Sequence, residues 1–355
     1  MSPFIYNGLP ARVVFGTGTV QRLPEELDRL KAARTLVLST PQQLAEAERV
    51  VGLIGSRAAG TLPMATMHTP VEVTDQAVEI VRAAQVDAVV AVGGGSTTGL
   101  SKAIALRTGI KQVIVPTTYA GSEVTPILGE TKNGVKTTQR NMKVLPDTVI
   151  YDVNLTLSLP PGLSATSGIN AIAHAVEALY AEARNPVISL MAEEGIQALS
   201  KALPDIKRDS KGLEARSLAL YGAWLCGICF GSVGAALHHR LCHILGGAYN
   251  LPHAETHTIV LPHAVAYNAS AEPDAMKRIG RALGASDPSI GLFNLAKNLG
   301  APTSLAEIGM PEAGIDHITD LVMKSTFYNP RALDRAAIRA LLAHAWAGDQ
   351  PSDKL

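Results

Sequence analysis

The chain has 355 residues, enough for about two domains with buried cores at roughly 100–200 residues per domain. It carries 31 Lys and Arg residues against 31 Asp and Glu residues, so its formal net charge is zero when histidines are counted as neutral. Only 17% of the residues are charged, whereas globular proteins average about 25%. This balance, without any dense Lys/Arg run, argues against a nucleic-acid partner, because phosphate binding needs a basic face.

Neither a targeting segment nor a disulfide framework is indicated. The N-terminal sequence MSPFIYNGLPARVVFG lacks a cationic start followed by an apolar stretch, and no segment has about 18 or more consecutive apolar residues. We therefore expect a soluble, cytoplasmic protein without a membrane partner. Among the three cysteines, Cys226 and Cys229 have CxxC spacing but lie in an apolar helical run without a second pair. We predict that both are buried core residues rather than a metal or redox site.

Up to about residue 155, the chain alternates short β-branched runs with amphipathic stretches, the pattern of strands and crossover helices in a parallel sheet. Residues 71–85 keep apolar side chains at helical spacing. Four apolar runs are short enough to be strands buried on both faces: 35–39, 87–92, 112–116 and 148–152. We predict an α/β domain over residues 1–155.

After Pro160 and Pro161 the alternation stops, and long stretches rich in Ala, Leu, Ile and Glu are interrupted by proline and glycine. This pattern predicts an all-α domain over residues 156–355. No low-complexity linker separates the two predicted domains, so we expect a ligand site in the cleft between them.

A glycine-rich turn follows the predicted strand 87–92. Gly93, Gly94 and Gly95 precede Ser96 and Thr97, where a helix should begin. Glycines let the backbone approach a ligand closely, and the amides of a helix N-terminus favour a phosphate. The run matches neither GxGxxG nor the Walker motif. By itself it fits a phosphate site or a tight structural turn equally well.

A second polar loop follows the next predicted strand, where hydroxyl-bearing side chains lie beside Gly121. Two such loops at the carboxyl ends of neighbouring parallel strands predict a dinucleotide site. Strand 35–39 ends without the acidic residue that NAD-selective sites place on the ribose, so we expect weak discrimination between NADH and NADPH. The candidate cofactor-binding residues are Ser39, Gly94, Gly95, Ser96, Thr117, Thr118 and Ser122.

Histidines are concentrated in the second half, where six of the ten lie between His238 and His263. His239 and His243 are four residues apart and share one helix face, and His253 follows a Gly-Gly break. His174, with Asn170 one turn before it, is a fourth candidate. These imidazoles suit either a divalent transition metal or acid/base chemistry around a polarised substrate oxygen. A direct role is left open for His238, His257 and His263, whereas none is expected for His68, His317 and His344.

These motifs resemble the iron-containing (group III) alcohol dehydrogenase family, which shares a fold with glycerol dehydrogenase and dehydroquinate synthase. The resemblance is carried by residues 13–23, GGGS at 93–96, PTT and GSE within 116–123, and the HxxxHxLGxxxxxPH string at 239–253. It implies a metal held by an Asp and three His, at positions matched here by Asn170, His174, His239 and His253. It further implies a His near the nicotinamide, matched by His243, and a lysine near the cofactor, matched by Lys143.

Two residues depart from the family pattern. Asn170 replaces the ligand Asp, and Gly99 replaces the Asp of GGGSxxD. Because an amide oxygen is a weaker and neutral donor, affinity for a divalent ion should fall, and a bound metal is an open question.

Within the family, the combination of GGGSTTGLSKAIAL, PTTYAGSEVTPILGET, Asn170 and YNPR at 328–331 resembles the maleylacetate reductase branch. That branch uses NADH or NADPH to reduce a carbon–carbon double bond during the breakdown of aromatic compounds. For this reaction we expect His243 to donate or relay a proton, His253 to position or polarise the ketone oxygen, and His174 and His239 to complete a polar pocket. A homodimer fits the family.

The dicarboxylate substrate of that branch requires cationic partners, for which Arg331, Lys136, Arg140 and Arg240 are candidates by residue type. The main alternative is a metal-dependent alcohol or polyol dehydrogenase of the same family. A cyclising lyase like dehydroquinate synthase and a non-enzymatic redox-sensing module are further alternatives.

Overall fold

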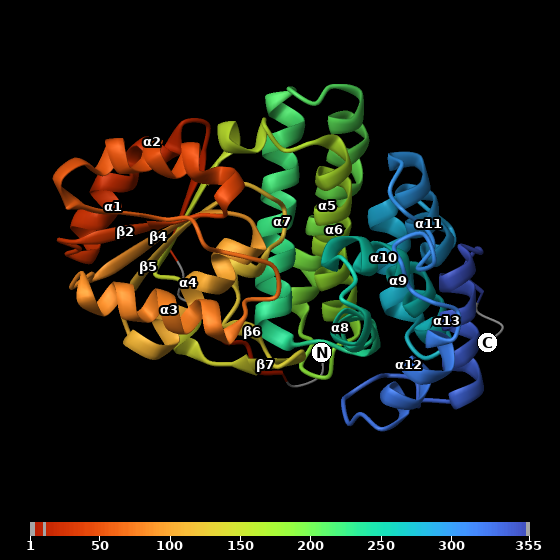
Figure 1. Ribbon diagram of the computed structural model, residues 1–355. Coiled ribbons are helices and arrows are strands. Elements are labelled where there is room, and N and C mark those ends of the chain that lie inside the picture. Colours follow the sequence, from red (N-terminus) through yellow and green to blue (C-terminus); the bar gives the residue numbers. More distant parts are fainter. Residues whose placement is uncertain (1–3, 10–11, 353–355) are drawn as a thin grey trace. The chain divides into compact units, whose positions relative to one another are not determined.

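The computed structural model describes residues 4–9 and 12–352, and the chain forms two compact units (Figure 1). The α/β unit is Leu9–Leu159, and the helical unit is Pro160–Leu355 together with Met1–Gly8. The sequence predicts a change of fold at residue 155, four residues before this division. The N-terminal segment differs from the expectation, because it groups with the helical unit rather than with the sheet.

A six-stranded sheet with only parallel neighbours forms the centre of the α/β unit. In spatial order it contains β1 (Arg12–Gly16), β8 (Thr148–Asp152), β5 (Lys111–Pro116), β4 (Ala88–Gly93), β2 (Thr35–Leu38) and β3 (Ala58–Leu62). The four predicted strands are confirmed as β2, β4, β5 and β8. Strands β1 and β3 were not predicted, because these edge strands are only partly buried and lack a continuous apolar run.

Helices cover both faces of this sheet, which explains why its inner strands are apolar throughout (Figure 1). On one face, Val90 and Val92 of β4 join the core made by α1 (Leu23–Leu30) and α2 (Leu44–Ile54). On the other, Val89 and Ala91 join the core made by α3 (Val71–Ala83) and α4 (Gly95–Thr108). The predicted helix over 71–85 is thus confirmed as α3.

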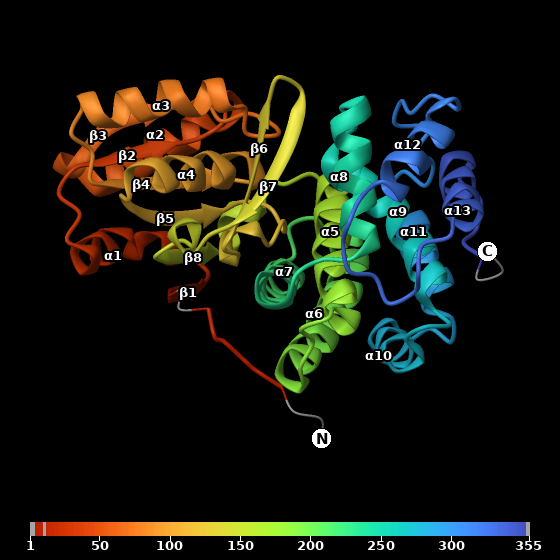
Figure 2. The same cartoon turned by 90° about the horizontal axis from the view of Figure 1, so that it is seen from below.

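An antiparallel hairpin, β6 (Ile127–Lys132) and β7 (Val135–Arg140), forms a second sheet in the α/β unit and is drawn as a pair of yellow strands in Figure 2. Asn133 and Gly134 make its turn, with φ of 50° and 76°. Positive φ at both central residues is the condition for a tight two-residue hairpin turn, which asparagine and glycine satisfy at low cost.

The helical unit contains nine α-helices in its described residues, which agrees with the predicted all-α class. They are α5 (Pro161–Tyr180), α6 (Pro186–Arg208), α7 (Leu213–Val233), α8 (Leu237–Tyr249), α9 (His253–Asn268), α10 (Pro273–Leu283), α11 (Pro288–Leu299), α12 (Gly314–Met323) and α13 (Arg335–Ala347). Helices α6 and α7 approach closely at two glycines. A Cβ at Gly195 would lie 2.7 Å from the Cys226 sulfur, and one at Gly222 would lie 3.0 Å from the Gly195 carbonyl oxygen.

Helix α7 is long and apolar enough to cross a membrane, but most of it is buried inside the protein, as expected of a core helix. It carries Cys226 and Cys229, both buried as predicted. Burial raises the pKa of the Cys229 thiol to about 12 and that of Cys226 well above its usual value. Neither thiol is therefore ionised near neutral pH.

Candidate active site

The glycine turn after β4 is set by close packing at the carboxyl ends of the strands. A Cβ at Gly93 would lie 2.4 Å from Thr97 Oγ1 and 2.6 Å from Gln43 Oε1. A Cβ at Gly94 would lie 2.9 Å from Thr118 Cγ2. Any side chain at these two positions would displace those neighbours. Gly94 is the N-cap of α4, so the first amides of this helix face outward from the turn.

The second polar loop, residues 117–126, lies beside the first. Thr117 N–H donates to the Gly93 carbonyl oxygen at 3.0 Å, and Gln43 Nε2 donates to Thr117 Oγ1 at 2.8 Å. Gln43, which sequence reasoning missed, therefore connects the ends of β2, β4 and β5. Thr117 is buried, whereas Gly94, Gly95, Ser96, Thr118 and Ser122 each keep some exposed surface. The Oγ atom of Ser122 is itself buried, so Gly94, Gly95, Ser96 and Thr118 are the predicted cofactor residues that a ligand can reach.

A buried lysine of α4 fixes the second loop from behind. Lys102 Nζ donates to the carbonyl oxygens of Thr125 (2.8 Å), Ile127 (2.9 Å) and Ser122, and to Thr125 Oγ1 (3.0 Å). Burial lowers the pKa of Lys102 to about 7, an effect that the neighbouring Glu123 opposes. Burial also raises the pKa of Glu123, whose carboxyl accepts a 2.8 Å bond from the Tyr151 hydroxyl.

Two predicted cofactor residues lie apart from this surface. Ser39 follows β2 but is fully buried. Lys143 lines a cavity of about 520 Å³ together with Lys111 and Asp147. Lys111 begins β5, whereas the glycine turn lies at the carboxyl ends of the strands, so the structure does not bring Lys143 together with the two loops.

The departure from GGGSxxD at Gly99 has a steric explanation. A Cβ at Gly99 would lie 2.3 Å from Thr69 Oγ1. Thr69 is buried, and its backbone has a left-handed conformation with φ of 46°. Its carbonyl oxygen accepts a 3.2 Å hydrogen bond from Thr131 N–H. The Thr69 side chain therefore occupies the space that an aspartate at position 99 would need.

In the helical unit, six histidines from α5, α8 and α9 form one cluster, which we call the histidine cluster. Neighbouring ring centroids within it lie 4.3 to 6.5 Å apart. The structure thus brings together the four histidines predicted from spacing and adds two whose role was left open. The members are His174, His238, His239, His243, His253 and His257.

Exposure divides these histidines into two groups. His174 and His239 are buried, and their rings stack on Phe230 with centroids 4.5 and 4.4 Å away. His243 and His253 are only partly buried. The latter two are therefore the predicted residues that can meet a substrate directly.

A further residue of the histidine cluster's surroundings was not predicted from the sequence. This residue is Glu177 of α5, which is completely buried. Its carboxylate accepts bonds from the backbone N–H groups of Ala236 (2.8 Å) and His238 (2.7 Å). It also lies 2.6 Å from His239 Nδ1. The carboxylate requires a proton on Nδ1, so it fixes the tautomer of His239 and leaves the Nε2 lone pair pointing into the cluster. The buried Nε2 has no other hydrogen-bond partner among the described residues.

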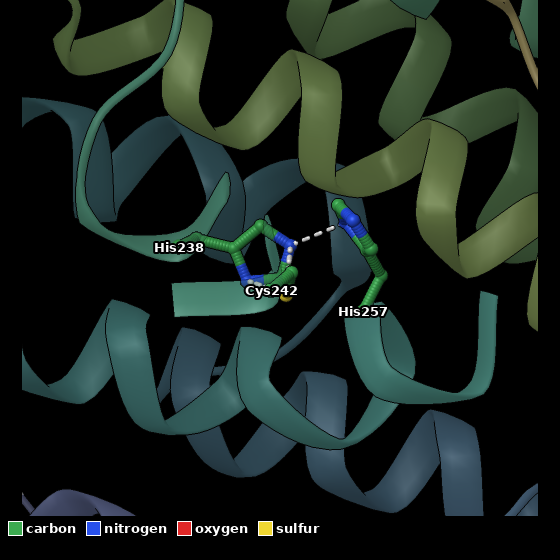
Figure 3. Close-up of side chains that lie close together, drawn as sticks. All are labelled: His238, Cys242 and His257. Carbon is green, nitrogen blue, oxygen red and sulfur yellow. Dashed lines mark hydrogen bonds between the residues drawn. The ribbon is translucent and has the colours of Figure 1, made fainter. Parts of the chain in front are cut away.

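His238, Cys242 and His257 lie close together (Figure 3). His238 Nε2 and His257 Nδ1 share a 3.0 Å hydrogen bond. Burial lowers the pKa of both imidazoles well below the usual value, so both are neutral. The Cys242 sulfur lies 4.0 and 3.8 Å from the two ring nitrogens of His238, nearly equidistant rather than along one lone pair. The group is therefore not preorganised to bind a metal.

Comparison with known proteins agrees with both units. Residues 10–153 match the family model "Iron-containing alcohol dehydrogenase", and residues 164–346 match "Fe-containing alcohol dehydrogenase family, C-terminal". A protein named maleylacetate reductase from Burkholderia cepacia is 55% identical over 99% of this chain and 100% of its own length. Two crystal structures titled as maleylacetate reductase are also similar, and each covers 99% of this chain and 100% of its own. The one from Agrobacterium tumefaciens has 52% identity and a TM-score of 0.95, and the one from Rhizobium sp. strain MTP-10005 has 53% and 0.94. The chain belongs to the iron-containing alcohol dehydrogenase family.

Proposed function

We propose that this chain is a maleylacetate reductase, which reduces the carbon–carbon double bond of maleylacetate to give 3-oxoadipate with NADH or NADPH. The observation that carries the proposal is the identity of about half of all residues, over nearly the whole length, with relatives of that name. The histidine cluster supplies groups that suit this chemistry.

The double bond of maleylacetate is conjugated to a ketone. Bound NADH or NADPH supplies a hydride to the alkene carbon β to that ketone. The electron pair of the double bond then moves toward the ketone and an enolate forms. The alkene carbon directly attached to the ketone must next receive a proton. The protein therefore has to stabilise negative charge on the ketone oxygen and deliver one proton to carbon.

His243 and His253 are proposed for these two tasks because they are the partly exposed members of the histidine cluster. In this assignment His243 delivers the proton, and His253 donates a hydrogen bond to the developing enolate oxygen. His174 and His239 complete the polar wall, with Glu177 as the positioning residue that fixes the His239 tautomer.

The donor set lacks the anionic ligand of the metal site that the family resemblance implies. Asn170, His174, His239 and His253 would offer three imidazoles and one amide, none of them anionic. The buried carboxylate at hand, Glu177, is already engaged by three N–H groups. A divalent ion there would have no charge compensation from its ligands. We therefore propose that the reaction proceeds without a metal.

The nucleotide is proposed to bind through the two loops of the α/β unit. Amides of Gly95 and Ser96 at the N-terminus of α4 suit a phosphate, and the partly exposed Thr118 offers a hydroxyl. The turn after β2, residues 39–43, carries neither an acidic nor a basic residue. We therefore propose weak discrimination between NADH and NADPH.

The test is to measure turnover of maleylacetate by the purified protein with each nucleotide. The loss of absorbance of the reduced nicotinamide monitors the reaction. We expect oxidation of both nucleotides, formation of 3-oxoadipate and full activity after dialysis against a chelator. Oxidation of alcohols that needs added iron or zinc, without reduction of maleylacetate, would instead identify a metal-dependent dehydrogenase.

Two properties of the whole molecule complete the proposal. We propose a homodimer, as the family resemblance implies, and a cytoplasmic location, as the sequence pattern predicts. Light scattering on the eluting protein would test the assembly, and a monomer at micromolar concentration would contradict it.

A further inference from the structure

If the substrate is maleylacetate, two carboxylates need cationic partners, and the structure separates the candidates. Arg331 is already committed to the protein, since its NH1 donates to the Tyr267 carbonyl oxygen at 3.0 Å. Its guanidinium also stacks over the Tyr267 ring, 4.2 Å from the centroid. Arg140 and Lys136 belong to β7 in the α/β unit. Only Arg240 shares a helix with the histidine cluster.

Arg240 lies on α8 one turn before His243, so the two side chains are surface neighbours on the helix. The next position along this stripe is Gly247, which has no side chain. Apart from its two chain neighbours and the backbone of the same helix, no described residue lies within 4 Å of where a Cβ would stand at Gly247, and this glycine is exposed. No side chain from another element therefore covers α8 at this position.

The guanidinium of Arg240 is held on one side and available on the other. It lies over the ring of Phe327, with its central carbon 5.3 Å from the ring centroid. The side chain is half-buried, and the part of the chain that the structure describes gives it no carboxylate or carbonyl partner. A guanidinium that lies over an aromatic ring can still offer N–H groups at its edge, in the fork that matches a carboxylate.

We propose that Arg240 binds one carboxylate of the substrate while His243 serves the reacting carbon, so that Arg240 selects dicarboxylate enones over neutral substrates. This inference rests on the proposed function. A neutral substrate would leave a partly desolvated guanidinium without a partner, and sites built to pair a polar group reject analogues that lack it far more strongly than apolar pockets do.

The test removes the charge from the protein and from the substrate in turn. The variant R240Q is assayed with maleylacetate, with cis-acetylacrylate, which lacks only the carboxylate on the ketone side, and with the monoester of the carboxylate on the alkene side. For maleylacetate we expect kcat/KM to fall about ten- to one-hundredfold, mainly through KM, the range for losing a charge-assisted hydrogen bond. For the analogue that lacks the partner carboxylate, R240Q and the parent protein should differ less than about twofold.

The controls separate binding from folding. R339Q, which removes an exposed arginine that pairs with Asp316, should leave all three substrates unaffected. R240K keeps the charge and stem but not the fork, so it should be intermediate for maleylacetate, and it provides the measurement if R240Q is unstable. The KM for NADH should not change.

An equal loss with all three substrates, or no loss with maleylacetate, would overturn the role of Arg240 while leaving the proposed function intact. If the parent protein fails to reduce maleylacetate at all, the proposed function itself is wrong and the inference falls with it.

Discussion

Replacing Glu177 with glutamine tests how the buried carboxylate organises the histidine cluster. Glu177 accepts three N–H groups with no exposed surface, two on Oε2 and one on Oε1. A glutamine has the same shape but carries an NH2 group in place of one oxygen. If the NH2 takes the Oε1 position it faces the His238 N–H, and if it takes the Oε2 position it faces the Ala236 N–H. Either orientation leaves one buried backbone donor without an acceptor.

The cost follows from the contacts. A buried unsatisfied donor costs about 1–3 kcal/mol, and the two surviving bonds each lose roughly 1 kcal/mol when the acceptor loses its charge. We expect E177Q to lower the free energy of unfolding by about 3–5 kcal/mol, a large part of the roughly 5–15 kcal/mol that domains possess. Denaturant unfolding measures this loss. If the NH2 takes the Oε2 position, it can no longer accept from His239 Nδ1, so the tautomer of His239 changes. In that orientation kcat should fall without a rise in the KM for NADH, and nitrogen NMR shifts of His239 would report the change.

The matched control is E193Q. Glu193 pairs with Arg278 and Arg281 at the surface of α6, so its loss should cost less than about 1 kcal/mol. If E177Q were as stable and as active as E193Q, the carboxylate would not be the organising group and the reasoning would fail.

Three further substitutions test other parts of the account. K102M removes an amino group that donates to three oxygens of the second loop and to the Ile127 carbonyl oxygen of β6, so the KM for NADH should rise at least tenfold. Surface variants such as K111M should leave this KM unchanged, and equal values for the two variants would refute a positioning role. G99D should lower the free energy of unfolding by about 1–3 kcal/mol, because its side chain overpacks against Thr69. Adding T69G should restore most of this free energy in the double variant, and additive losses would refute the steric explanation. H263F should flatten the acid side of the stability profile. Burial lowers the pKa of His263 from 6.5 to about 4, so the unfolded chain binds more protons than the folded chain between these pH values. Through this group, the free energy of unfolding of the parent protein should fall by about 2 kcal/mol from pH 7 to pH 5. An unchanged slope in H263F would contradict this.

How far the fold follows from sequence depends on burial. The inner strands β2, β4, β5 and β8 are apolar because helices cover both faces, and this makes them visible as continuous runs. The edge strands β1 and β3 are half-exposed and gave no such run. The β6–β7 hairpin did have a local signal, the Asn133-Gly134 turn, and could have been predicted from it.

The candidate site divides in the same way. The spacing of His239 and His243 placed them on one helix face because helical periodicity is a local property, whereas His253 begins the next helix. Glu177 follows His174 by three residues and lies on the same face of α5. Only the fold reveals that the backbone N–H groups of Ala236 and His238 donate to the Glu177 carboxylate. The separation of Lys143 from the two loops depends on strand direction in the sheet, which no single motif encodes.

The central claim is that hydride reaches a carbon–carbon double bond without help from a metal. The most direct measurement uses NADH deuterated at the transferred position, with maleylacetate and a chelator present, followed by NMR of the product. The account predicts 3-oxoadipate with one deuterium on the carbon β to the ketone. Deuterium on a carbinol carbon, or turnover that stops when the chelator is added, would contradict it.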